Sequence, residues 1–176
     1  MRKMVIAFAA VCAAALAFGT RTEAARCVRP PVVPDALKVP GIHAPQLRLP
    51  ATGVQIYTCT LDATGAYVWK FKAPEATLFS ESGRRVGDHF GGPTWRLRDG
   101  SKVVGQLLAK ADAPEAGAVP WLLLAIADNS GRGALADARF IQRVHTSGGV
   151  APADGCDAST VGEDARVDYT ADYYFW

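Results

Sequence analysis

Thr94-Trp95-Arg96-Leu97-Arg98-Asp99-Gly100-Ser101-Lys102-Val103-Val104 is the stretch that most directly indicates the fold. Its Asp-Gly pair separates two strand-like runs. Such a pair favours a hairpin with a two-residue type I′ turn, because glycine adopts the positive φ that this turn needs. A two-residue loop would place Trp95 opposite Val104 on one face. We therefore predict strands at residues 94–98 and 101–110.

Comparable short runs, separated by turn residues, recur over the rest of the chain. Strands are predicted at residues 46–51, 54–60, 66–72, 77–81, 121–127, 138–146 and 167–176. Residues 66–72 alternate aromatic side chains with lysines, as in a half-buried strand, whereas residues 121–127 are apolar throughout, as in a central one. No segment beyond the N-terminus has a 3.6-residue period. Eight or nine such strands predict an all-β fold, a single-domain antiparallel β-sandwich or small barrel.

The N-terminus has the three parts of a secretory signal peptide. Arg2 and Lys3 precede an Ala-rich apolar run at residues 4–18, and small residues then provide a cleavage site before Ala25. The apolar run is shorter than the roughly 20 residues that a membrane-spanning helix needs. We therefore predict a cleaved signal peptide at residues 1–24 and a periplasmic or secreted location.

Cleavage would leave one β domain at residues 25–176. Five prolines before residue 46 predict an extended lead, so that the core of the domain is about residues 46–176. The cleaved chain carries 16 basic and 16 acidic side chains. This balance, without a basic stripe, argues against a nucleic-acid partner.

Stable insertion into a membrane after cleavage is not expected either. An outer-membrane barrel needs lipid-facing apolar residues at alternate positions, but Asp168, Thr170 and Asp172 fall in phase with Trp176. Nothing in the pattern specifies an oligomeric state, although the last strand could lie at an edge and pair with a second copy.

Three cysteines remain after cleavage: Cys27, Cys59 and Cys156. In an oxidising compartment at least one disulfide is expected. Cys59 lies in an apolar strand-like run, and Cys156 follows a loop rich in Gly and Pro that must dock against the domain. We therefore predict a Cys59–Cys156 disulfide, with Cys27 either free or paired with one of the other two.

Several pieces of the sequence, taken in order, are similar to one secreted family. The pieces are residues 53–59, 69–71, 73–76, 89–95, 99–101, 120–124, 141–143, Thr146, Gly148-Gly149 and 169–173. In this combination they resemble the bacterial and fungal family known as domain of unknown function 3455. The resemblance spans roughly residues 32–176 and implies a single exported domain. Because the family has no established activity, it implies no catalytic residue.

The segment from His89 to Trp95 is the most unusual in composition. Two glycines allow a close approach of the backbone, and Pro93 fixes a turn. His89 and Trp95 are predicted to flank a ligand pocket, the first as a titratable group and the second as a stacking platform. Tyr57 and Gln142 are further candidates for ligand binding. The alternative is a tight loop that holds a hydrogen-bonded histidine and a core tryptophan.

Catalytic patterns are weaker. His43, His89 and His145 could ligate zinc or copper, but their spacing places no two on one face, so no metal or cofactor is predicted. His89, Asp99 or Asp128, and Ser147 follow the order of a hydrolase triad, yet triads are defined by geometry and no G-x-S-x-G motif is present. The sequence favours a non-enzymatic role in binding a small molecule or glycan, or a structural role. The alternative is a hydrolase or metalloenzyme that uses His89.

Overall fold

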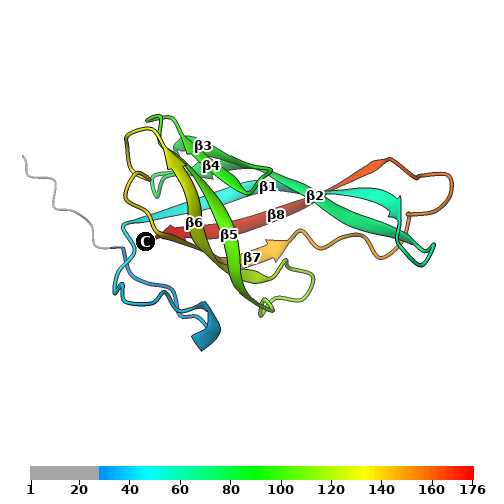
Figure 1. Ribbon diagram of the computed structural model, residues 1–176, viewed down its shortest axis with the longest axis horizontal. Coiled ribbons are helices and arrows are strands. Elements are labelled where there is room, and N and C mark those ends of the chain that lie inside the picture. The colour runs from blue at the N-terminus through cyan, green and yellow to red at the C-terminus, as the bar shows by residue number, and fades with distance from the viewer. Residues whose placement is uncertain (1–27) are drawn as a thin grey trace, which may run out of the picture.

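Residues 28–176 are described by the computed structural model, and their eight antiparallel strands form one sheet that closes into a barrel (Figure 1). A short 3-10 helix, η1, precedes the strands. The elements are η1 Asp35–Leu37, β1 Leu47–Leu61, β2 Tyr67–Phe79, β3 Arg85–Phe90, β4 Thr94–Leu97, β5 Lys102–Ala111, β6 Trp121–Ser130, β7 Phe140–Gly148 and β8 Asp164–Phe175. Each strand pairs with the next along the chain, and β8 pairs with β1. The all-β prediction is confirmed, and of its two forms the chain adopts the barrel.

Two pairs of predicted strands are continuous in the structure. β1 joins residues 46–51 to 54–60 through Gly53, where a side chain would collide with the Glu75 carbonyl and lie 2.7 Å from the Ala76 Cβ. β2 likewise runs through Pro74, because β2 pairs only with β1 at that position and a missing N–H is tolerated there. The prediction of a break at each of these places was wrong.

The hairpin of β4 and β5 is confirmed, but its predicted register was wrong. Trp95 lies opposite Val103, and Thr94 lies opposite Val104. The turn is longer than two residues, because the Leu97 N–H donates to the Ser101 carbonyl at 2.9 Å and Asp99 accepts from the Ser101 N–H. A three-residue loop, residues 98–100, moves the pairing by one residue.

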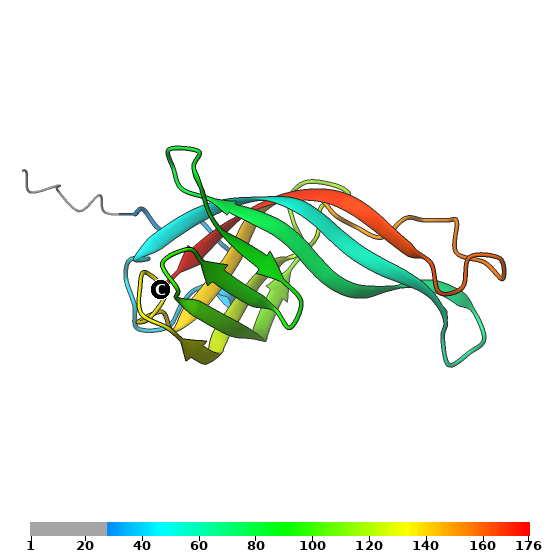
Figure 2. The same ribbon diagram turned by 90° about the horizontal axis from the view of Figure 1, so that it is seen from above.

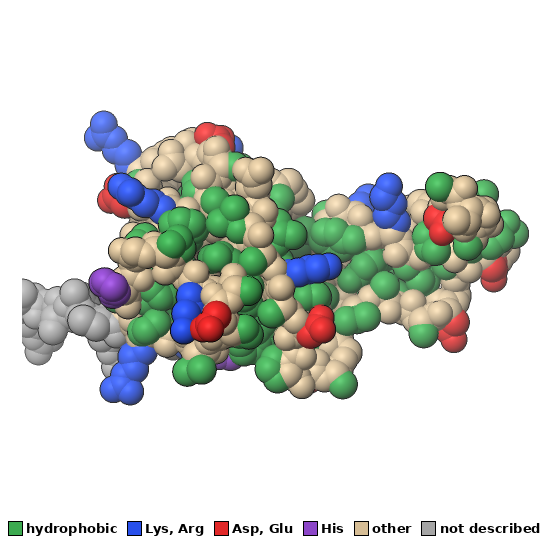
Figure 3. All heavy atoms as spheres, turned by 60° about the horizontal axis from the view of Figure 1, so that its bottom comes forward, with side chains coloured by type: hydrophobic (Ala, Val, Ile, Leu, Met, Phe, Trp, Pro, Cys, Tyr) green, Lys and Arg blue, Asp and Glu red, His purple; other side chains and the backbone are tan. Residues whose placement is uncertain are grey.

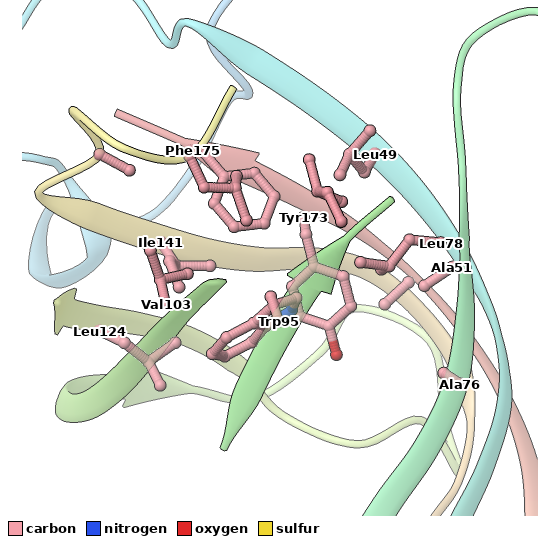
Figure 4. Close-up of a cluster of buried hydrophobic side chains, with 14 of the residues drawn as sticks. Leu49, Ala51, Ala76, Leu78, Trp95, Val103, Leu124, Ile141, Tyr173 and Phe175 are labelled. Atoms are coloured by element: carbon pink, nitrogen blue, oxygen red, sulfur yellow. The ribbon is translucent and has the colours of Figure 1, made fainter. Parts of the chain in front are cut away.

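Side chains from β1, β2 and β4 to β8 pack together in the barrel interior (Figure 4). Trp95, Tyr173 and Phe175 are fully buried at its centre. Glycine and alanine face these large rings, and a Cβ at Gly105 would lie 3.1 Å from the Trp95 indole. Towards the end where β1 begins, the interior is apolar; towards the other end it carries Gln55, His89 and Tyr169.

Beyond the barrel, β1, β2 and the start of β8 continue as a long arm (Figure 2). Its cross-strand pairs include Tyr57 with Phe71, Cys59 with Trp69 and Leu61 with Tyr67, which alternation places on one face. Leu61, Tyr67 and Phe71 are about half exposed. Figure 3 shows hydrophobic side chains spread over the arm and over its junction with the barrel.

The loop between β7 and β8 is fastened along this arm. The Cys59–Cys156 disulfide is present, with a Cα–Cα distance of 5.3 Å, which confirms the predicted pairing. The Trp69 indole N–H donates to the Asp154 carbonyl at 2.8 Å. The predicted signal peptide and Cys27 lie outside the described residues. Within residues 28–176 the structure has no helix long and apolar enough to cross a bilayer.

Candidate functional site

An open groove of about 1170 Å³ lies over the end of the barrel where β1 begins. The turn between β2 and β3, which projects from the barrel in Figure 2, forms one wall, and Val28 and Arg29 of the lead also line the groove. Leu47, Leu49 and Leu97 line it from the apolar end of the barrel core. The closed sheet thus presents a hollow with an apolar floor at the edge of its own core.

Arginines are concentrated around this groove. The lining includes two acidic residues, Glu81 and Asp99, and five arginines: Arg29, Arg48, Arg84, Arg85 and Arg98. Since the chain from residue 25 onward has equal numbers of basic and acidic side chains, this is a local excess of positive charge. Strands and turns far apart in sequence contribute these side chains, and only closure of the barrel brings them together.

Two of the five arginines already have carboxylate partners. One terminal nitrogen of Arg48 donates to both carboxylate oxygens of Asp172 at 3.0 and 2.9 Å, and Arg85 pairs with Asp88 at 2.6 Å. Hydrogen bonding to Asp172 raises the pKa of Arg48, which keeps this guanidinium charged. The ion pairs among residues 28–176 do not include the other three, so Arg29, Arg84 and Arg98 supply the unpaired positive charge.

The acidic side chain at the β4–β5 turn accepts hydrogen bonds from its own turn and from the loop between β6 and β7. Asp99 accepts hydrogen bonds from the Ser101 N–H at 2.9 Å, the Ser101 hydroxyl at 2.6 Å and the Ala134 N–H at 2.8 Å. These three donors occupy most of the lone pairs of the carboxylate, so it has little room for a hydrogen bond to a neighbouring arginine. Asp99 therefore holds the turn and the Ala134 segment together at the rim of the groove.

His89 and Trp95, the predicted pocket residues, do come together, but inside the barrel. Their rings are stacked with centroids 4.2 Å apart and an angle of 11° between planes. Both side chains are buried, and the His89 Nδ1–H donates to the Thr94 carbonyl at 2.9 Å. Burial lowers the pKa of His89 to about 3, with the nearby Arg143 charge acting in the same direction. His89 is therefore neutral at physiological pH.

The other two predicted residues lie in different surroundings. The Tyr57 hydroxyl donates to the Gly149 carbonyl at 2.7 Å, which places Tyr57 where the arm leaves the barrel. Gln142 lies on the outer side of the sheet under the N-terminal lead, where its amide donates to the Leu37 carbonyl at 2.6 Å. It also accepts from the Trp176 indole N–H at 2.9 Å. The structure therefore does not bring Gln142 to His89 and Trp95.

Arg143, the neighbour of Gln142, faces the barrel interior and was not among the predicted site residues. β7 pairs Arg143 with Leu122 on one side and with the buried Tyr173 on the other. Two nitrogens of its guanidinium donate to the Pro120 carbonyl at 3.1 and 2.7 Å. The sequence carries one indication of this position, because Ile141 and Arg143 are two residues apart in a strand and so share a face.

The residues considered for catalysis are separately engaged. The Ser147 hydroxyl donates to Glu115 at 2.6 Å, His89 binds the Thr94 carbonyl, and Asp99 lies in its turn. His145, which was considered as a metal ligand, has a backbone φ of 50°, and its Nδ1 forms a hydrogen bond with Asp172 at 2.9 Å. Over the described part of the chain, no group of three or more His, Cys, Asp or Glu side chains is placed to hold a metal ion.

The chain matches a known family over most of its length. Residues 40–176 match the family described as protein of unknown function DUF3455. No curated protein and no solved structure matches the chain. The match covers all eight strands and therefore the whole barrel with its arm.

Proposed function

This chain belongs to the DUF3455 family, and we propose that it is an exported binding protein that holds a small anionic molecule in the arginine-lined groove. The observation that carries the proposal is that three arginines around an apolar floor, Arg29, Arg84 and Arg98, take part in no ion pair among residues 28–176. A guanidinium binds carboxylates and phosphates through paired, charge-assisted hydrogen bonds. An apolar floor adds favourable burial for the uncharged part of the same ligand.

Export is supported by the disulfide and by the sequence. The Cys59–Cys156 bond would persist in an oxidising compartment and would be reduced in most cytosols. The N-terminal segment carries the three-part pattern of a signal peptide. Together these two features support a periplasmic or secreted location.

A binding role accounts for the groove better than the hydrolase alternative. A general base must reach the proton that it abstracts, yet His89 is 3 % exposed and its Nδ1–H is used by the Thr94 carbonyl. A neutral glycan is also a poorer match than an anion, because sugars stack on exposed aromatic faces. Tyr174, the aromatic residue that lines the groove, is buried beside Arg48.

The position of the ligand can be tested by NMR with a defined probe. We would titrate ¹⁵N-labelled protein with octyl phosphate and, separately, with the uncharged octyl glucoside. The expected result is that octyl phosphate shifts the backbone amides of residues 80–86 and 97–99, and that octyl glucoside at equal concentration shifts them much less. Equal responses to the two probes, or shifts concentrated on the arm, would contradict the proposal.

A further inference from the structure

The barrel interior at the end away from the groove contains a cationic side chain without an acidic partner. The register of β7 and β8 places Arg143 directly across from Tyr173, whose side chain fills the interior. The ion pairs among residues 28–176 do not include Arg143, and two of its nitrogens donate to a backbone carbonyl, that of Pro120. A partly buried cation that lacks a counter-ion is costly, because a carbonyl dipole compensates it only in part.

The tyrosine side chains near this guanidinium are neutral. Burial raises the pKa of Tyr57, Tyr169 and Tyr173, and the Arg143 charge opposes each of these rises. The Tyr169 and Tyr173 hydroxyls are 3.3 Å apart, so they interact with each other. The charge of Arg143 is thus directed at phenols that remain protonated at neutral pH, and they cannot neutralise it.

Two further donors in the interior meet no acceptor in good hydrogen-bond geometry. Gln55 Nε2 and Trp95 Nε1 are buried without a hydrogen bond, and each residue is 1 % exposed. Trp95 packs edge-to-face on Tyr173, with ring centroids 5.3 Å apart. The Gln55 amide is close enough to the Tyr169 hydroxyl to lower its pKa. The tyrosine pair therefore links both unpartnered donors to the Arg143 cation.

We propose that this polar end of the barrel interior binds a small oxyanion, such as the carboxylate of formate or acetate. Arg143 would supply the counter-charge, and Gln55 Nε2 and Trp95 Nε1 would donate to the anion. A carboxylate has lone pairs for about four hydrogen bonds, which is the kind of acceptor that this cluster of donors lacks. None of these three side chains lines the groove, so the inference does not depend on the proposed function.

The chain after β7 restricts the size of such a ligand. A Cβ at Gly149 would lie 2.8 Å from the Tyr169 Cβ and 3.0 Å from the Gln55 Cγ, so the backbone at Gly149 packs directly on this region. Tyr57 holds the same segment through the Gly149 carbonyl. The surroundings favour an anion of a few atoms over an extended molecule.

Indole NMR provides a direct readout with an internal control. The described chain has four tryptophans, and the Nε1 atoms of Trp95 and Trp121 are both buried and without a partner. Trp121 lies in the outer cluster against His145 and not in the barrel interior. Titration with sodium formate is expected to move the Trp95 Nε1–H resonance downfield and to saturate, while that of Trp121 stays in place. Trp95→Phe identifies the resonance.

Variants decide whether the response comes from the proposed site. Arg143→Met should abolish the saturable shift. Gln55→Met leaves the Arg143 charge in place and should weaken formate binding by about tenfold. This second variant keeps the test possible if Arg143→Met does not fold. The groove variant Arg84→Gln/Arg98→Gln should titrate like the wild type. Absence of a saturable Trp95 shift with formate, acetate and phosphate would overturn the inference. It would also be overturned by an unchanged midpoint in Gln55→Met or by loss of the shift in the groove variant.

Discussion

The imidazole of His89 lies parallel to the indole of Trp95 inside the barrel, with ring centroids 4.2 Å apart. Tyr173 meets both rings edge-on, at 5.0 Å from His89 and 5.3 Å from Trp95. A histidine in such surroundings acts as a neutral aromatic residue that satisfies one backbone carbonyl, that of Thr94. This arrangement makes the stability of the barrel depend on pH.

Replacement of His89 should remove part of the acid sensitivity of the fold. Burial lowers the pKa of His89 to about 3, whereas in the unfolded chain this pKa has its ordinary value of 6.5. The contribution to stability is therefore complete above pH 6.5 and is lost progressively as the pH falls towards 3. At pH 5 the loss is about 2 kcal/mol. The free energy of unfolding in urea should fall between pH 7 and pH 5 in both proteins. We expect this fall to be smaller in His89→Phe than in the wild type, by about 2 kcal/mol. Equal differences in the two proteins would show that His89 is not buried as described.

The disulfide should contribute strongly to global stability. The Cys59–Cys156 bond spans 97 residues and fastens the β7–β8 loop to the arm. Its removal in Cys59→Ser/Cys156→Ser should lower the free energy of unfolding by about 2–4 kcal/mol, because the unfolded chain loses a constraint. Urea unfolding of this variant beside wild type treated with a reductant should give matching losses. A variant as stable as the oxidised wild type would contradict this account of the arm.

Gly53 should not tolerate a side chain. A Cβ there would collide with the Glu75 carbonyl, and backbone atoms cannot move aside cheaply. Gly53→Ala should therefore destabilise the barrel by about 2 kcal/mol or more. The matched control is Gly91→Ala, whose Cβ would lie 3.3 Å from the Ala73 Cβ. We expect its free energy of unfolding to stay within about 1 kcal/mol of that of the wild type. Similar thermal midpoints for the two variants would be inconsistent with the close β1–β2 approach.

Gln142 should matter for stability and not for ligand binding. Its amide joins the Leu37 carbonyl to the Trp176 indole, so Gln142→Met would leave two buried polar groups without partners. We expect a loss of about 2 kcal/mol or more in urea unfolding. The affinity for octyl phosphate should remain that of the wild type. Weaker probe binding at unchanged stability would indicate that the residue lies at a binding site instead of under the lead.

The sequence supports prediction where a local pattern determines the structure. The Asp-Gly turn at residues 99–100 and the apolar run at 121–127 both belong to the barrel as expected. β3 was missed because Gly87, Asp88 and His89 are poor strand formers, and Gly87 is required by a close approach of the β4 backbone. Neighbouring strands, and not local preference, hold β3 in place.

The candidate sites were harder to predict, for two physical reasons. The arginines of the groove come from the lead, β1, two turns and the start of β3, so nothing in their spacing relates them before the barrel closes. In β7 the prediction selected Gln142, whereas the interior position belongs to Arg143. Side chains alternate between the two faces of a strand. A choice that is wrong by one residue therefore selects a side chain on the outside of the barrel instead of one in its interior.

Isothermal titration of octyl phosphate into wild type and into Arg84→Gln/Arg98→Gln tests whether the groove arginines bind an anion. Lys70→Gln/Lys110→Gln serves as the control, since it removes two exposed charges that lie outside the groove lining. We expect the groove variant to have a Kd about tenfold higher or more, and the control to stay within about twofold of wild type. Equal Kd values for the wild type and the groove variant would show that these arginines do not bind the phosphate.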